Sequence, residues 1–170
     1  MHIFFIDWIG PSQNEILNIQ KYYNKKTKKT YNPKEKIIKK YQENTQDALL
    51  KYNIPNQLDG AYFISFFPFI GSNIQDGEKT IKRNYDCDNY AGITKIIQDV
   101  LTDKDSGIIK KDSQEYIKCL YINQTIRDIE VKKTGMIVIL QEYNDNSQYI
   151  DLKKQLKEVN KLILQLKKEA

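Results

Sequence analysis

Two aspartates, Asp86 and Asp88, are the residues of this sequence with the clearest capacity for chemistry. They stand in the stretch Asp86-Cys87-Asp88-Asn89. In an extended segment residues i and i+2 point to the same side, so the two carboxylates would lie next to each other. Like charges at that separation are stable mainly with a cation between them, and carboxylate oxygens select Mg²⁺ or Mn²⁺. The alternative is a turn and helix cap, in which Asp88 or Asn89 accepts backbone N–H groups.

A third aspartate and one lysine could complete such a site. Asp112 precedes a predicted strand, and it would join the pair if that strand lies beside residues 86–89. Lys95 lies opposite the apolar stripe of the helix predicted after Asn89, so it faces away from the core and could hold a phosphate or stabilise developing charge. The alternative for Lys95 is a surface ion pair with Asp99 at i+4.

Several other chemistries are excluded by composition. The chain has two cysteines, Cys87 and Cys119, and one histidine, His2, which are too few for a disulfide framework or an ordinary zinc site. The same shortage argues against Ser-His-Asp and Cys-His catalysis. The seven glycines are scattered and form no phosphate-binding loop. Any chemistry must therefore depend on carboxylates and lysines.

Positive charge is concentrated near the N-terminus. The 170 residues carry a net charge of +5, yet residues 21–40 hold nine lysines and one acid, a local charge of +8, so the remainder sums to −3. Tyrosines interleave with these lysines, and cations with flat rings suit phosphates and bases. This pattern favours nucleic-acid binding over the alternative of a solvated, lysine-rich loop. The residues expected to contact DNA are Lys21, Lys25, Lys26, Lys28, Lys29 and Tyr31.

Hydrophobic periodicity predicts the elements that must position these residues. Strands are expected at 2–9, 60–68, 114–122 and 135–143, of which 60–68 is apolar enough to be covered on both faces. Helices are expected from Pro33 to about Asn53, with Asn32 as a cap, and around 93–101, while the lysine-rich stretch between the first strand and the first helix is expected to be a loop. The predicted fold class is α/β, a small mixed sheet of about four strands flanked by two helices, with a further helix at the C-terminus.

The C-terminal segment, 147–170, is expected to form an amphipathic helix. Its apolar residues alternate at spacings of four and three, and this seam either docks on the body or pairs with a second copy. The seam consists of Leu152, Leu156, Val159, Ile163 and Leu166. No run reaches the roughly 18 apolar residues of a membrane span, and residues 1–9 lack the basic flank of a signal peptide, so a cytoplasmic protein without membrane contact is expected.

In order and spacing these motifs resemble the RusA family of Holliday junction resolvases, which are endodeoxyribonucleases often carried by phages and prophages. The family's Asp-x-Asp-Asn corresponds to residues 86–89, its helical lysine to Lys95, its Asp-x-Leu to residues 99–101, and its Asp-Asp-x-Gln to residues 111–114. The stretch from Gly10 to Asn14 looks like the family's Pro-Pro-Ser-x-Asn, which adds Asn14 to the expected DNA contacts. The resemblance covers roughly residues 3–143.

The resemblance implies a RusA-like nuclease domain at 1–146, followed by the helix at 147–170. It implies that Asp86, Asp88 and Asp112 bind Mg²⁺, or Mn²⁺ as a substitute, and that Lys95 assists at the phosphate. The implied activity is resolution of four-way DNA junctions by paired nicks, carried out by a homodimer in recombination, repair or phage DNA processing. One alternative is a non-cleaving dimeric DNA-binding protein, and another is a nuclease of the same fold that acts on other branched or single-stranded substrates. Two departures stand out: residues 90–92 are an insertion, and Lys111 replaces the first aspartate of Asp-Asp-x-Gln.

Overall fold

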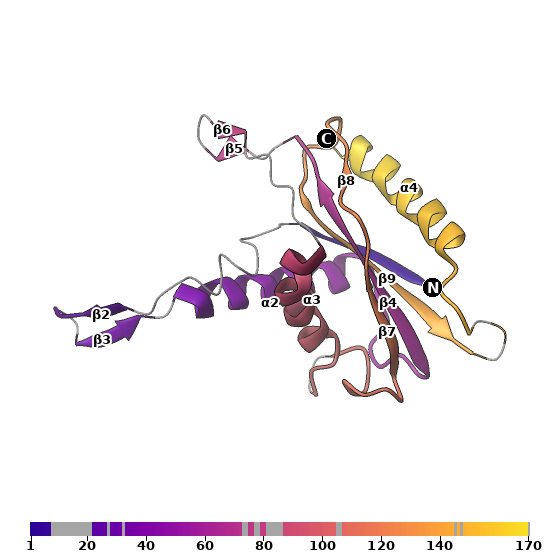
Figure 1. Ribbon diagram of the computed structural model, residues 1–170, viewed down its shortest axis with the longest axis horizontal. Coiled ribbons are helices and arrows are strands. Elements are labelled where there is room, and N and C mark those ends of the chain that lie inside the picture. Colours follow the sequence, from indigo (N-terminus) through magenta and orange to yellow (C-terminus); the bar gives the residue numbers. More distant parts are fainter. Residues whose placement is uncertain are drawn as a thin grey trace.

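The computed structural model (Figure 1) describes most of the chain. The described residues are 1–7, 22–26, 28–31, 33–72, 75–76, 79–80, 87–104, 107–144, 146 and 148–169. Within these ranges only the backbone is described at 22–24, 29–31, 33, 75–76, 79–80 and 87–89.

A five-stranded mixed sheet forms the centre of the fold. Its main strands lie in the order β1 (His2–Asp7), β9 (Gly135–Tyr143), β4 (Ala61–Ile70) and β7 (Ile117–Ile122). The fifth strand, β8 (Ile126–Arg127), pairs with β4 beyond the end of β7. Strand β9 runs antiparallel to both of its neighbours, whereas β7 and β8 run parallel to β4. Two short hairpins lie off the sheet, β2 (Tyr22–Asn24) with β3 (Lys29–Tyr31) and β5 (Gln75–Asp76) with β6 (Lys79–Thr80).

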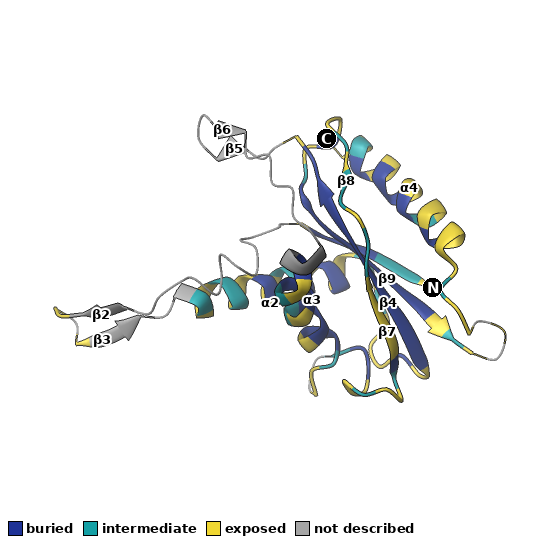
Figure 2. Ribbon diagram, viewed as in Figure 1, coloured by how far each residue is buried: buried dark blue, intermediate teal, exposed yellow. Residues whose placement is uncertain are grey.

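Strand β4 is buried along all ten of its residues because helices cover both faces of the sheet. Successive residues of a strand point to opposite faces. Ile64 and Phe66 therefore join a core cluster with α2 (Pro33–Lys51) and α3 (Cys87–Leu101). Phe67 and Phe69 join a second cluster with α4 (Leu152–Lys168). Figures 1 and 2 show the resulting three layers, with the buried sheet between α2 and α3 on one side and α4 on the other.

Helix α3 is held by one apolar face, which determines where its polar face points. Ile93, Ile97 and Leu101 recur at a spacing of four, and each is fully buried in the cluster shared with α2 and the sheet. With 3.6 residues per turn, Lys95 falls on the opposite side and half of its side chain is exposed. This placement of Lys95 away from the core agrees with the sequence prediction.

Helix α4 docks on the sheet of its own chain with three of the five predicted seam residues buried. Val159, Ile163 and Leu166 are buried as expected, whereas Leu152 and Leu156 of the predicted seam are 41% and 44% exposed. The reason is the buried Gln155, whose side-chain amide donates to Gln141 Oε1 at 3.0 Å. A buried amide needs such a partner, so this contact sets the rotation of the first helical turns.

Ion pairs fix the other end of α4 to the body. Glu169 Oε2 accepts from Lys133 Nζ at 2.8 Å and from Lys51 Nζ at 3.2 Å. Lys167 Nζ lies 2.9 Å from Asp128 Oδ2 and also bonds Glu130. The helix is therefore attached to the sheet by its apolar face and to the surrounding loops by charges.

The long elements that the sequence predicts correspond closely to the observed ones, whereas the short strands were not predicted. The four predicted strands are β1, β4, β7 and β9, and the helix predicted from Pro33 is α2. The lysine-rich stretch was expected to be a loop, but it contains the β2–β3 hairpin, whose strands pair from Tyr22 with Tyr31 to Asn24 with Lys29. The predicted cap Asn32 lies outside the described residues. Within the described ranges, none of the helices has the length and apolar composition that a membrane span requires.

Candidate functional site

The solvent-facing side of α3 carries the polar residues of the candidate site. Lys95 and Asp99 are one helical turn apart and form an ion pair, with Lys95 Nζ 3.0 Å from Asp99 Oδ1. Asp88 lies in the first turn of α3, seven residues before Lys95. Seven residues are close to two turns, so the Cα atoms of Asp88 and Lys95 lie on the same side of the helix, roughly 10 Å apart along its axis.

Asp112 is brought to this helix by the connection that follows α3. The backbone N–H of Ile109 donates to Leu101 O at the end of the helix at 2.8 Å, and Leu58 N–H donates to Ile108 O at 2.6 Å. A turn follows, in which Ser113 O accepts from the N–H groups of Tyr116 and Ile117 at 3.0 and 2.8 Å. These bonds hold residues 110–113 against the outer side of α3 before β7 begins.

Two side chains of α3 converge on Asp112. Lys95 Nζ donates to Asp112 Oδ2 at 2.6 Å, and Gln98 Nε2 donates to Asp112 Oδ1. The ammonium group of Lys95 therefore lies between Asp112 and Asp99. Hydrogen bonds, to Asp112 first and to Asp99 second, raise the pKa of Lys95 above its ordinary value. Lys95 thus provides a permanent positive charge at an exposed position beside a carboxylate.

The structure brings some of the predicted site residues together and leaves others undescribed. Asp112 and Lys95 meet, although they come from different motifs. Asp86 lies outside the described residues, and so does the side chain of Asp88. Among the side chains that are described, no group of three or more His, Cys, Asp and Glu residues could hold a metal ion. Convergence of Asp86, Asp88 and Asp112 on one ion therefore stays a prediction.

The described part of the site fits a hard divalent cation. A carboxylate has about four acceptor positions, and Asp112 uses one on each oxygen for Lys95 and Gln98. The next residue, Ser113, has a buried hydroxyl oxygen without a hydrogen-bond partner among the described atoms. Carboxylate and hydroxyl oxygens are the donors that Mg²⁺ prefers. Mg²⁺ held by Asp112, together with Asp86 and Asp88 of the other acidic motif, is chemically consistent with this donor set.

Gln98 belongs to the site and was missed by the sequence reasoning. Its side chain is only 5% exposed, and its carboxamide reaches Asp112 from within α3. One signal was present in the sequence, because Gln98 stands next to Ile97 and one turn after Thr94, beside the apolar stripe of the predicted helix. A carboxamide at a buried helical position requires a polar partner. That argument predicts a contact without identifying Asp112 as the partner.

Those predicted DNA contacts that the structure describes belong to a hairpin outside the sheet. Lys25, Lys26 and Lys28 form the exposed tip of the β2–β3 hairpin, which Figure 1 shows beyond the N-terminal end of α2. Lys29 and Tyr31 lie in β3, where only the backbone is described, and Lys21 and Asn14 lie outside the described residues. The positive charge continues onto α2, where Lys36, Lys39 and Lys40 are exposed.

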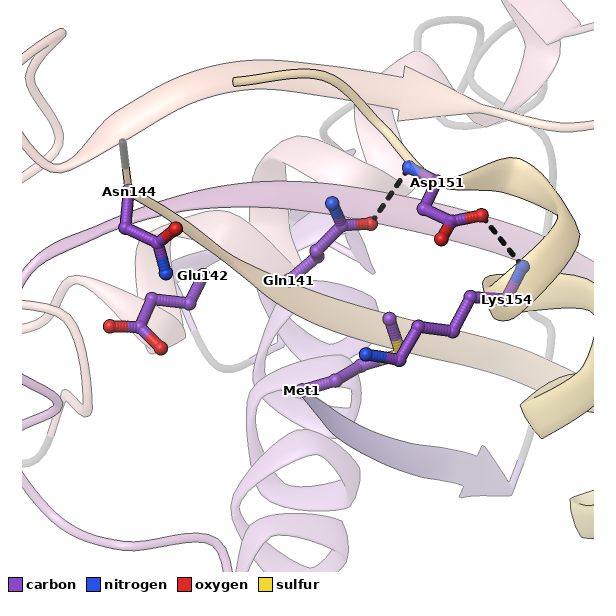
Figure 3. Close-up of a pocket in the computed structure, with 6 residues that line it drawn as sticks. All are labelled: Met1, Gln141, Glu142, Asn144, Asp151 and Lys154. Atoms are coloured by element: carbon purple, nitrogen blue, oxygen red, sulfur yellow. Dashed lines mark hydrogen bonds between the residues drawn. The ribbon is translucent and has the colours of Figure 1, made fainter. Parts of the chain in front are cut away.

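Two hollows of the described surface were not predicted. Figure 3 shows one of about 160 Å³ between the end of β9 and the start of α4, where Gln141 Oε1 accepts from Asp151 N–H at 3.1 Å. None of the predicted site residues lines it. The other is a groove of about 930 Å³ between the loop after α2 and the loop after α3. Lys104 and Lys110 line this groove, and Lys110 is two residues from Asp112.

Comparisons of the chain with protein-family models, with curated proteins and with solved structures found no match.

Proposed function

We propose that the chain is a Mg²⁺-dependent endodeoxyribonuclease with a RusA-like fold, which resolves four-way DNA junctions as a homodimer. The observation that carries the proposal is the position of Asp112. This residue follows α3 in the sequence, yet its carboxylate contacts Lys95 and Gln98 of α3, and Asp88 lies in the first turn of the same helix. An aspartate that lies after α3 in the sequence thus contacts the helix on which Asp88 lies, as a common site requires.

The chain's own residues have defined roles in this proposal. Asp86, Asp88 and Asp112 would hold Mg²⁺, which when bound offsets negative charge at the scissile phosphate. Lys95 is the nearest cation to Asp112 and would place its ammonium group against a phosphate oxygen, where it stabilises the charge that develops in the transition state. Gln98 holds the carboxylate of Asp112 in one orientation. The exposed pair with Asp99 keeps Lys95 at this position when no phosphate is bound.

The basic hairpin would bind the arms of the junction. Its tip presents three exposed lysines at a distance from the sheet, and the first half of α2 continues the positive surface. Lysines on a hairpin contact the phosphate backbone and carry little sequence information, so the protein would recognise the shape of the DNA. Two copies would present two equal sites to a two-fold symmetric junction, and a pair of nicks would then resolve it.

The experiment that tests the proposal is cleavage of a synthetic four-way junction in the presence and absence of Mg²⁺. We expect paired nicks from the wild-type chain, no nicks with EDTA, and no nicks from Asp88→Asn, which should still bind the junction in a gel-shift assay. Asp47→Asn, on the exposed face of α2, is the matched control and should cleave normally. Equal cleavage of linear duplex DNA would contradict the proposal.

One observation favours the alternative of a DNA-binding protein that does not cleave. Both oxygens of Asp112 already accept from protein side chains, and Lys95 supplies a cation to Asp99 as well. Such a network can be purely structural. Calorimetric titration with Mg²⁺ separates the two functions, because a protein that binds DNA without cleaving it would show no heat of metal binding.

A further inference from the structure

The hydroxyl group of Ser113 is a buried polar group that the fold leaves without a partner. Its oxygen is shielded from solvent, and it forms no hydrogen bond with the described atoms. Because a hydroxyl rotates about its Cβ–Oγ bond, the lack of a bond means that no described donor or acceptor lies within its reach. Buried polar groups are nearly always hydrogen-bonded, and an exception points to a role at a site or to a bound ion or water.

The turn that begins at Ser113 does not use this hydroxyl. At the start of a turn, a serine hydroxyl commonly accepts a hydrogen bond from the backbone N–H of a residue further along the chain. In this turn the carbonyl oxygen of Ser113 accepts instead, from the N–H groups of Tyr116 at 3.0 Å and Ile117 at 2.8 Å. The hydroxyl is therefore left for a group from outside this turn.

The position of Ser113 distinguishes it from two other buried atoms without a partner in the described part of the chain, Ser65 Oγ and Gln155 Oε1. These two lie on the side of the sheet that α4 covers, since Gln155 belongs to α4 and Ser65 pairs with Ile139 of the α4 cluster. Asp112 contacts α3, on the opposite side of the sheet (Figure 1), and Ser113 directly follows it. Residues 112 and 113 form a bend, so the alternation of side chains in a strand does not separate them.

We propose that the hydroxyl oxygen of Ser113 is a further ligand of the Mg²⁺ ion that Asp112 binds. The proposal rests on the metal site of the proposed function, and it concerns the variable position of the Asp-Asp-x-Gln motif, to which the resemblance assigns no role. A serine or threonine hydroxyl is a hard oxygen donor that binds Mg²⁺ in phosphate-binding loops. It is also neutral, so it adds a ligand without adding negative charge to a site that must accept a phosphate.

This role has opposite consequences for the metal-free fold and for metal binding. A buried hydroxyl without a partner destabilises a folded chain, so replacing it by a methyl group is neutral or stabilising. Replacing a hydroxyl that bonds another part of the protein would instead destabilise the fold. Mg²⁺ supplies the missing partner, so the same replacement should weaken metal binding. Ser113→Ala is therefore expected to preserve the fold and to impair the metal site.

The test compares Ser113→Ala with Ser65→Ala, which removes a second buried hydroxyl without a partner on the other side of the sheet. The full chain is titrated with MgCl₂ in a calorimeter and melted with and without Mg²⁺. Without metal, both variants should melt at or above the wild-type temperature. Ser113→Ala should bind Mg²⁺ at least about tenfold more weakly and lose most of the rise in Tm that Mg²⁺ produces, whereas Ser65→Ala should retain both.

A thiol at the same position gives a spectroscopic readout of direct ligation. In a chain that carries Cys87→Ser and Cys119→Ser, Ser113→Cys should show a thiolate-to-metal charge-transfer band when Co²⁺ is added, because a thiolate is a strong ligand of transition metals. Ser65→Cys in the same background should show no such band.

The outcomes separate the ligand from the nuclease. Wild-type Mg²⁺ affinity in Ser113→Ala, a lower melting temperature of the metal-free Ser113→Ala chain, or no Co²⁺ band from Ser113→Cys would overturn the role of Ser113, even if the wild-type chain nicks junctions. Mg²⁺ binding that depends on Ser113, without nicking of four-way junctions, would refute the nuclease and leave the ligand standing. A wild-type chain that binds no Mg²⁺ would overturn both.

Discussion

Lys95 Nζ lies 2.6 Å from Asp112 Oδ2, although seventeen positions of sequence separate the two residues. The helix fixes one partner and the connection after it fixes the other, so the pair is a property of the tertiary structure. A lysine that also contacts Asp99 at 3.0 Å stays charged over the whole physiological range, since both hydrogen bonds raise its pKa. This fixed cation at an exposed carboxylate is the strongest electrostatic feature of the described part of the site.

Removing that cation should slow cleavage without abolishing DNA binding. Lys95→Met keeps the length of the side chain and deletes its charge, so we expect junction cleavage to fall about 100-fold, the usual cost of losing one group that stabilises the transition state. Single-turnover rates on a labelled four-way junction measure this. Lys104→Met, which alters another exposed lysine just after α3, should cleave at the wild-type rate. Equal rates for both variants would remove Lys95 from the reaction.

Gln98 should influence the affinity for metal through Asp112. In Gln98→Leu the hydrogen bond to Asp112 Oδ1 is lost while the packing of a 5% exposed side chain is kept. Loss of a group that orients a metal ligand weakens binding about 10-fold to 100-fold. Isothermal titration with Mg²⁺ should show this weakening, and Gln42→Leu, on the exposed side of α2, should leave the affinity unchanged. Unaltered binding in Gln98→Leu would assign Gln98 a purely structural role.

The tip of the β2–β3 hairpin should carry a measurable share of the salt dependence of DNA binding. Each phosphate contact contributes about 0.9 to the slope of log affinity against log salt. Replacing the three tip lysines, Lys25, Lys26 and Lys28, by glutamine should therefore reduce the slope by about 2.7, as measured by fluorescence anisotropy between about 50 and 200 mM salt.

A charge-matched variant distinguishes a specific contribution of the hairpin tip to DNA binding from a general loss of positive charge. Lys153, Lys157 and Lys161 are exposed on α4, on the other side of the sheet from α2. Their replacement by glutamine removes the same net charge and should change the slope by less than about 0.9, the contribution of one phosphate contact. Equal slopes for the two triple variants would show that the hairpin has no special role.

The sequence predicts the sheet better than it predicts the site, for a physical reason. Strands β4 and β9 are long, nearly uninterrupted apolar runs, and burial on both faces requires such runs. The short strands β2, β3, β5, β6 and β8 have two or three residues each, too few to show a period. The hairpin within the lysine-rich stretch depends on backbone pairing that its polar side chains do not indicate.

The sequence identified the candidate site residues by their residue types, but it did not predict which of them contact one another. That Lys95 faces solvent follows from helical geometry, because the apolar residues of α3 fix its rotation. The Asp99 contact at i+4 was equally predictable. The contact of Lys95 with Asp112 was not predictable, since it depends on the path of residues 107–113, and no local pattern specifies how a connection returns to a helix.

In α4 the heptad spacing identified Val159, Ile163 and Leu166, but Leu152 and Leu156 matched the spacing without being buried.

The face by which α4 docks predicts which leucines support the fold. Leu162 is 3% exposed in the cluster with Phe67 and Ile137, whereas Leu164 is 58% exposed. Leu162→Ala should lower the free energy of unfolding by about 2–4 kcal/mol, and Leu164→Ala should change it by less than about 0.5 kcal/mol. Urea unfolding followed by circular dichroism measures both. A large effect at Leu164 would mean that a second surface covers the outer side of α4.

The C-terminal ion pairs predict a stability difference that depends on pH. Hydrogen bonds from Lys133 first, and then from Lys51, lower the pKa of Glu169 below its ordinary value. A carboxylate whose pKa is depressed by folding stabilises the protein above its unfolded pKa, about 4.3, and that contribution disappears as the pH falls through the folded value.

Glu169→Gln should therefore be less stable than wild type at pH 7 by roughly 0.5 kcal/mol, a difference in Tm of about 1–2 °C, because these pairs are partly exposed to solvent. The difference in Tm should shrink as the pH falls below the unfolded pKa and should vanish once the carboxylate of Glu169 is protonated in the folded protein. Glu43→Gln, which alters an exposed pair with Lys39 within α2, should show no such convergence, because that pair does not attach one element to another. If the gap between wild type and Glu169→Gln stayed constant from pH 7 to pH 3, the ion pairs with Lys133 and Lys51 would not be what attaches this end of α4.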